Sequence, residues 1–254
     1  MSATTTPMLR RLAAEEATGA LLCDTGTLYL HGGRVVHAES PAAPGVDVLL
    51  TACGRLTPDD WRRAVDRAGA ARRVGPFLVE TGQLTLGEAE LIHLAAIYDA
   101  AYFVLDPADG PTRFRRGAAH WFGTVRPVDA GSLERETRRR RDLLDALWPV
   151  PQTDTAPVVR RTLPQAPPVT RRQRAVLDLA DGVRTPAAIA RLLGRPAFHT
   201  LVDVRRLTAA GHLDTPRGPY PTAPPPFPAW AGAVAGDPDT ALLRRLRDAL
   251  ETRL

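Results

Sequence analysis

Two proline-rich stretches divide this chain of 254 residues into segments that must build separate hydrophobic cores. Residues 149–168 are rich in Pro, Thr and Gln, and residues 216–228 contain three consecutive prolines. Stretches of this kind form extended connections rather than packed elements. We therefore expect a first domain over residues 8–148, a linker over 149–168, a small second domain over 169–215, a proline-rich segment over 216–236 and a C-terminal helix over 237–254.

Short apolar runs near the N-terminus predict a small antiparallel sheet. The runs are Ala20 to Cys23, Thr27 to His31 and Arg34 to Ala38, and they are separated by Asp24, Gly26 and the Gly32-Gly33 pair. Short runs joined by such turns are typical of a β-meander. A second hairpin is expected from Tyr102 to Leu105 and from Thr112 to Phe114, across Asp109-Gly110.

Helix signals fill the rest of the first domain. Thr57 precedes Pro58, and Thr85 has Glu88 three residues later, which are N-terminal capping patterns. Further helices are expected over Leu9 to Ala17, Pro44 to Ala52 and Ser132 to Leu147. The fold class that follows is α+β, with a mixed N-terminal domain before a small winged-helix domain and a C-terminal helix.

The second domain reads as three short helices in about 45 residues. The first runs from Thr170 to Leu179, and the second is capped by Thr185 and ends at Gly194. The third runs from Pro196 to Ala210. Helix, glycine turn and helix is the geometry that places a second helix in the major groove of DNA.

One face of the third helix carries polar groups at helical spacing. Arg195, His199, Asp203 and Arg206 are separated by 4, 4 and 3 positions, so they share a face. The arginines and His199 suit contacts to phosphate or base edges, whereas Asp203 would repel phosphate. The residues expected to contact DNA are Arg195, His199 and Arg206, with Arg171, Arg172, Arg174 and Arg217 on phosphates.

Positive charge is concentrated in the second half of the chain. Residues 1–110 hold 9 arginines against 14 acidic residues, whereas residues 149–235 hold 11 against 5. An anionic partner is therefore expected for the second half. Lysine is absent from the sequence, which excludes a P-loop lysine, a Schiff-base lysine and a Ser/Lys dyad.

Two resemblances agree with this organisation. Residues 176–213, VLDLADGVRTPAAIARLLGRPAFHTLVDVRRLTAAGHL, resemble the winged-helix modules of actinobacterial regulators and the winged-helix partners of small GTPases. The N-terminal segment resembles PATAN-type bacterial signalling domains. The matching positions are Thr18, Gly19, Gly32, Gly33, Arg34, His37 and Ala38. This second resemblance implies signalling or protein contact rather than catalysis.

No catalytic or metal motif is recognisable in the sequence. None of the three serines lies in GxSxG, neither cysteine belongs to a CxxC pair, and GxGxxG and HExxH are absent. His31 and His37 flank a glycine turn, but no carboxylate or cysteine completes a ligand set there. Opposite charges at i, i+4 explain the run from Arg138 to Arg141 as a solvated helix. We expect no enzyme activity, no cofactor and no metal.

The leading hypothesis is therefore a transcription regulator or signalling protein. Its second domain would bind duplex DNA, and its N-terminal domain would sense a signal or form a homo-oligomer. The alternative is a protein-interaction adaptor, for example for a small GTPase or a kinase, that does not bind DNA. A ligand sensor is a third option, although nothing in the sequence places a pocket. The sequence lacks an export signal and a membrane span, so a cytoplasmic location is expected.

Overall fold

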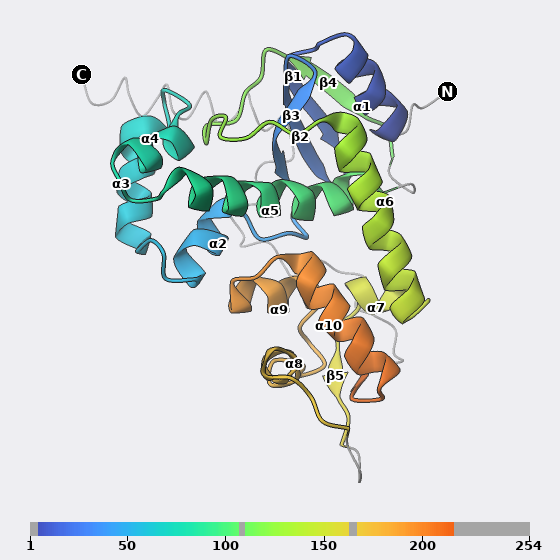
Figure 1. Cartoon of the computed structure of the whole chain (residues 1–254). Coiled ribbons are helices and arrows are strands. Elements are labelled where there is room, and N and C mark those ends of the chain that lie inside the picture. Colours follow the sequence, from blue (N-terminus) through green and yellow to red (C-terminus); the bar gives the residue numbers. More distant parts are fainter. Residues whose placement is uncertain (1–4, 107–109, 163–166, 216–254) are drawn as a thin grey trace, which may run out of the picture. The chain divides into compact units, whose positions relative to one another are not determined.

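The computed structural model describes residues 5–106, 110–162 and 167–215 (Figure 1). These residues belong to one compact unit by their contacts. The fold is α+β, as the sequence predicts. The proline-rich segment 216–236, the C-terminal helix 237–254 and Arg217 lie outside the described residues. In the described part of the chain, no helix is both long enough and apolar enough to cross a membrane.

A four-stranded antiparallel sheet has the order β3-β2-β1-β4. The strands are β1 (Gly19–Cys23), β2 (Gly26–His31), β3 (Arg34–Glu39) and β4 (Arg113–Arg116). The meander β1 to β3 confirms the sequence prediction. The predicted second hairpin is wrong, because Tyr102 to Val104 complete a long helix and β4 pairs with β1 instead.

Six helices accompany the sheet (Figure 1). They are α1 (Thr5–Ala14), α2 (Val46–Ala52), α3 (Pro58–Ala68), α4 (Val74–Glu80), α5 (Leu86–Val104) and α6 (Ala130–Leu147). Helix α5 is the central element. Its residues Ile97 and Ala101 pack against Leu21 and Leu28 of the sheet, and its N-terminal half contributes Ala89 to a second core. Thr85 caps α5 with Glu88 in the predicted capping box.

The three helices expected over residues 169–215 are all present, and we call these residues the trihelical module. The helices are α8 (Arg171–Leu177), α9 (Pro186–Leu193) and α10 (Ala197–Ala209). Thr170 and Thr185 cap the first two, and Gly194 ends α9 in the left-handed conformation at φ 59°, which glycine adopts without strain. Strand β6 (Leu213–Asp214) follows α10.

The stretch predicted to be a linker contains packed elements in its described part. It forms α7 (Gln152–Thr155) and β5 (Val159–Arg160), and β5 pairs with β6. Val158 is fully buried with Ile189 and Val204 in the core of the trihelical module. Burying this apolar side chain is favourable. Part of the proline-rich stretch therefore completes the hydrophobic core of the module.

Candidate functional site

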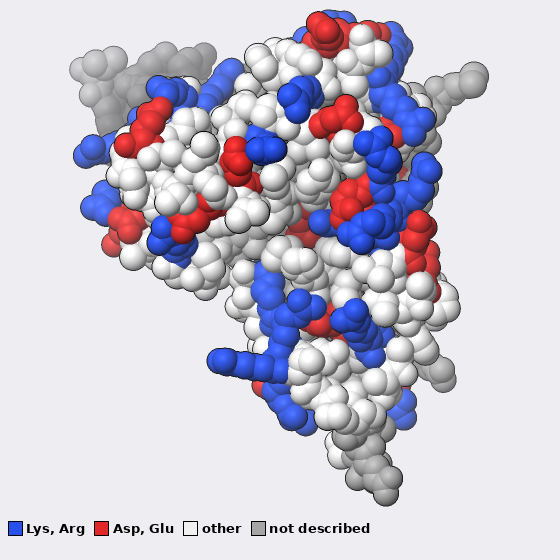
Figure 2. All heavy atoms as spheres, in the orientation of Figure 1, with Lys and Arg blue, Asp and Glu red and all other residues white. Residues whose placement is uncertain are grey.

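Unpaired arginines lie on the exposed side of the trihelical module. Arg171 and Arg174 on α8 and Arg206 on α10 are exposed, and the described residues offer none of them an ion pair. His199 is also exposed on α10. Figure 2 shows basic groups gathered over the region of α8 to α10. This surface can contact an anion such as a phosphate.

Asp203, the acidic residue on the predicted polar face of α10, is paired with arginines of the trihelical module. Its side chain is 2% exposed, and Arg172 Nε lies 2.7 Å from one of its carboxylate oxygens. Arg195 lies 3.6 Å from the same oxygen, and only 20% of the Arg195 side chain is exposed. Two of the seven predicted DNA contacts, Arg172 and Arg195, therefore serve an internal ion pair.

The N-terminus of α10 is held by the N-terminal domain. Asp99 on α5 is fully buried, and its carboxylate accepts the N–H groups of Ala197 at 2.6 Å and of Phe198 at 2.8 Å. Burial raises the pKa of Asp99 to about 6, against the opposing effect of these two hydrogen bonds. The backbone donors that begin α10 are consequently used inside the molecule.

A second face of α10 packs against the helices of the N-terminal domain. Phe198 and Leu201 are buried together with Leu144 of α6, and Tyr102 of α5 packs against this cluster. The guanidinium of Arg140 lies 4.6 Å from the centre of the Phe198 ring, a favourable cation-π distance. The opposite face of α10 joins the core of the trihelical module. His199 and Arg206 stay exposed between these two faces, as does Ala209 at the end of the helix.

Arg205 lies inside this interface with its side chain 2% exposed. It forms a two-pronged ion pair with Asp154 at 2.8 and 2.6 Å, and Asp145 lies 3.2 Å away. The carbonyl of Trp148 accepts a further hydrogen bond. A buried guanidinium that is satisfied on all sides fixes how α10 meets α6 and α7.

The arginine run on α6 is paired within the helix and with its neighbours. Arg139 and Arg140 both bind Glu136, the latter at 2.9 Å as the i, i+4 pattern predicts. Arg141 donates to the carbonyl of Tyr102 at 2.8 Å. These contacts account for the three residues without a ligand, but the predicted solvated helix is wrong for Arg140 and Arg141, because Arg140 is only 13% exposed and both side chains donate to carbonyls of α5.

Three histidines from separate segments meet beside β3. His37 belongs to β3, His93 to α5, and His120 to the loop after β4. The rings of His37 and His120 stack with centroids 3.7 Å apart, and His37 Nδ1 lies 3.1 Å from His93 Nε2. Burial lowers the pKa of His37 well below its usual value and that of His93 to about 4. Both rings are therefore neutral at neutral pH.

Glu39 completes the cluster at its solvent side. The backbone N–H of Phe122 donates to His120 Nδ1 at 3.2 Å, so the ring proton lies on Nε2, which donates to Glu39 at 2.9 Å. Tyr29 donates its hydroxyl to the other Glu39 oxygen at 3.1 Å. The bond from His120 is the main reason that the pKa of Glu39 is lowered, so Glu39 is ionised at neutral pH.

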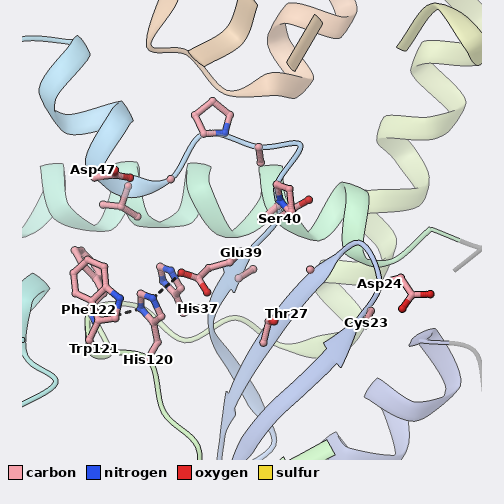
Figure 3. Close-up of a pocket in the computed structure, with 18 residues that line it drawn as sticks. Cys23, Asp24, Thr27, His37, Glu39, Ser40, Asp47, His120, Trp121 and Phe122 are labelled. Carbon is pink, nitrogen blue, oxygen red and sulfur yellow. Dashed lines mark hydrogen bonds and ion pairs between the residues drawn. The ribbon is translucent and has the colours of Figure 1, made fainter. Parts of the chain in front are cut away.

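This cluster borders a pocket of about 490 Å³ that the sequence did not predict (Figure 3). His37, Glu39 and His120 also bring their potential ligand atoms within 4.8 Å of one another. The sequence prediction that no carboxylate accompanies His37 is therefore wrong. Glu39 follows His37 by two positions on a strand and so shares its face, which is a signal that the sequence does contain. His93 and His120 come from distant segments and gave no signal.

The loop between β3 and α2 forms one wall of the pocket and also touches the trihelical module. Pro41 and Pro44 line the pocket, and Arg191 of α9 donates to the carbonyl of Pro41. A Cβ atom added at Gly194 would overlap Cβ of Ala52 in α2. The turn between α9 and α10 therefore approaches α2 closely.

Comparisons of the chain with protein-family models, with curated proteins and with solved structures found no match.

Proposed function

We propose that this protein is a non-catalytic regulator whose trihelical module binds duplex DNA mainly through the phosphate backbone. The observation that carries the proposal is the exposure of Arg171, Arg174 and Arg206 without ion pairs in the described part of the chain. Exposed guanidinium groups supply the attraction that dominates binding to duplex DNA. The resemblance of this module to winged-helix regulators supports the same proposal.

The contacts that α10 already makes within the protein favour binding to phosphates over binding to base edges. Its first two N–H groups bind Asp99, and Arg195 is engaged with Asp203. His199 and Arg206 are the exposed members of the predicted recognition face. Two side chains can discriminate few base pairs, so binding should vary little with DNA sequence.

The experiment is fluorescence anisotropy of a labelled duplex titrated with the full-length chain. The triple variant Arg171→Ala/Arg174→Ala/Arg206→Ala should bind at least about 10-fold more weakly, because three guanidinium groups no longer reach the phosphates. The matched control is Arg62→Ala on α3, a side chain 71% exposed and paired with Asp59. That variant should bind DNA like the wild type.

Equal affinity of the triple variant and the wild type, with both folded by circular dichroism, would remove the basis of this proposal. A shuffled duplex that binds as tightly as the original supports phosphate contact. A difference in affinity of about 100-fold or more between the original and the shuffled duplex would instead indicate that α10 reads base edges.

The second candidate function is a protein-interaction adaptor. The burial of α10 against α5 and α6 favours it, because a helix with both long faces covered is poorly placed to enter a groove. A stoichiometric complex with one purified host protein, such as a small GTPase or kinase, together with no DNA binding at low salt would support it. A dimerising N-terminal domain would make the chain self-associate. Sedimentation equilibrium measures this self-association.

A further inference from the structure

The charged side chains that line the pocket beside β3 are acidic, whereas the chain as a whole has a net positive charge. Asp24, Glu39 and Asp47 line the pocket, and no arginine is among its described lining residues, although the chain has 33 basic residues. Its volume of about 490 Å³ lies within the range of small-molecule sites. The carboxylates of a cavity produce a negative potential, which Arg191 at the carbonyl of Pro41 offsets only at the wall next to α9.

Glu39 is oriented as a hydrogen-bond acceptor facing this cavity. Tyr29 and His120 each donate to one of its oxygens from the protein side. The Glu39 side chain is 48% exposed, so its remaining lone pairs are accessible. A carboxylate carries about four lone-pair positions, and two bonds therefore leave room for a ligand N–H group.

Trp121 and Phe122 also line the pocket, beyond the rings of His37 and His120 as seen from this carboxylate (Figure 3). Trp121 is 38% exposed, and its ring lies 4.8 Å from that of His120. Phe122 lines the same side and is almost fully buried. The faces of aromatic rings attract ammonium and guanidinium groups. A carboxylate ligand, by contrast, would be repelled by Glu39.

A second polar side chain lines the pocket beside Glu39. His37 is 4% exposed and belongs to the pocket wall. Its Nδ1 atom lies 3.1 Å from His93 Nε2, so this nitrogen is engaged inside the protein.

The ring geometry disfavours a metal ion at the same donors. His37 and His120 are nearly parallel, with 7° between their planes, so their in-plane lone pairs do not converge on one point. His120 Nδ1 accepts the Phe122 N–H, which keeps the proton on Nε2. Metal ligation by that nitrogen requires the loss of this proton and of the hydrogen bond to Glu39.

We propose that this pocket binds a small organic cation with an ammonium or guanidinium group, and that Glu39 is its counter-ion. Trp121 contacts the cation through its ring face, and Asp24 and Asp47 strengthen the negative potential at the rim. The proposal concerns the N-terminal domain and does not depend on DNA binding by the trihelical module.

The test is isothermal titration of the full-length chain with three probes of matched length. These are 1,5-diaminopentane, the uncharged 1,5-pentanediol and the anionic glutarate. The diamine should bind at 1:1 with a dissociation constant of about 1 mM or lower. The diol and glutarate should bind at least about 10-fold more weakly, because they lack the positive charge.

Two charge-matched variants locate the site. Glu39→Gln keeps an acceptor for His120 and removes the charge, so it should weaken diamine binding by about 10-fold or more. Asp66→Asn removes the same charge from an exposed position on α3 and should bind like the wild type. The thermal midpoints of both variants confirm that the fold is retained.

Equal binding of diamine and diol overturns the proposal, as does unchanged affinity in Glu39→Gln. Absence of heat with the diamine at about 10 mM, tenfold above the expected constant, overturns it as well. A Zn²⁺ ion that binds at 1:1 where the diamine does not would assign the donors to a metal and also overturn it.

Discussion

The carboxylate of Asp99, on α5, lies 2.6 Å from the backbone nitrogen of Ala197, the first residue of α10, and accepts its hydrogen bond. Pro196 precedes Ala197 and has no side-chain cap bond of its own. A residue 98 positions earlier in the chain therefore acts as the N-cap. This arrangement ties α10 to the N-terminal domain and leaves its first turn inaccessible to a ligand.

Replacing Asp99 by Ala should lower the free energy of unfolding by about 2 to 3 kcal/mol, because two buried N–H groups lose their acceptor. Asp99→Asn keeps one acceptor oxygen and should cost less than Asp99→Ala. Urea denaturation of the full-length chain measures both. A loss below about 0.5 kcal/mol in Asp99→Ala would show that water or another group replaces the carboxylate.

Asp99 should also make stability depend on pH in an unusual direction. Its folded pKa of about 6 lies above the unfolded value of about 3.9. The folded state therefore binds the proton more tightly, and the contribution of this group to stability rises as pH falls from about 7 to about 4, by about 2 to 3 kcal/mol. The wild type should gain this much over Asp99→Asn in that window. Parallel stability curves for the two proteins would contradict the assignment.

Arg205→Leu should destabilise the protein by about 3 to 5 kcal/mol, because Asp154 would keep its charge with a side chain 11% exposed and without its main partner. The double variant Arg205→Leu/Asp154→Leu should recover most of this loss, since it removes the unpaired charge. Thermal or urea unfolding of the two variants gives the coupling. Additive losses in the double variant would mean that the pair is not the unit of stabilisation.

Gly194→Ala and Gly54→Ala form a matched pair at left-handed positions. Both glycines have positive φ, 59° and 73°, but of the two only the Cβ at position 194 would overlap another atom, Cβ of Ala52. Both substitutions cost about 1 kcal/mol in backbone strain, and Gly194→Ala should cost about 1 to 3 kcal/mol more for the overlap. Equal free energies of unfolding for the two variants would contradict the close contact between the α9–α10 turn and α2.

The parts of the fold that the sequence predicts are those set by local chemistry. Thr85 with Glu88 and Thr185 with Pro186 indicate helix starts through groups a few positions apart, and both helices begin there. The failed hairpin over Tyr102 to Leu105 shows the limit. An apolar run of that length suits a strand or a buried helix end equally, and packing around α5 decides for the helix.

The sites depend on contacts between distant residues, which no local pattern contains. The polar stripe of α10 is recognisable from spacing, yet the burial of Asp203 under Arg172 needs two helices to meet. The histidine cluster that borders the pocket brings together His37, His93 and His120, which span 83 positions of the sequence. Of its members, Glu39 alone has a local signal, from its alternation with His37 on β3.

The most direct test of the proposed regulator is the salt dependence of its affinity for a duplex. We predict that log K falls linearly with log salt concentration, with a slope of about −3 or steeper for the wild type. The slope should become shallower by about 1 for each of Arg171, Arg174 and Arg206 that is replaced by Ala. An affinity that does not change between about 50 and 200 mM salt, or no binding at the lower concentration, would contradict the claim that this arginine surface binds DNA.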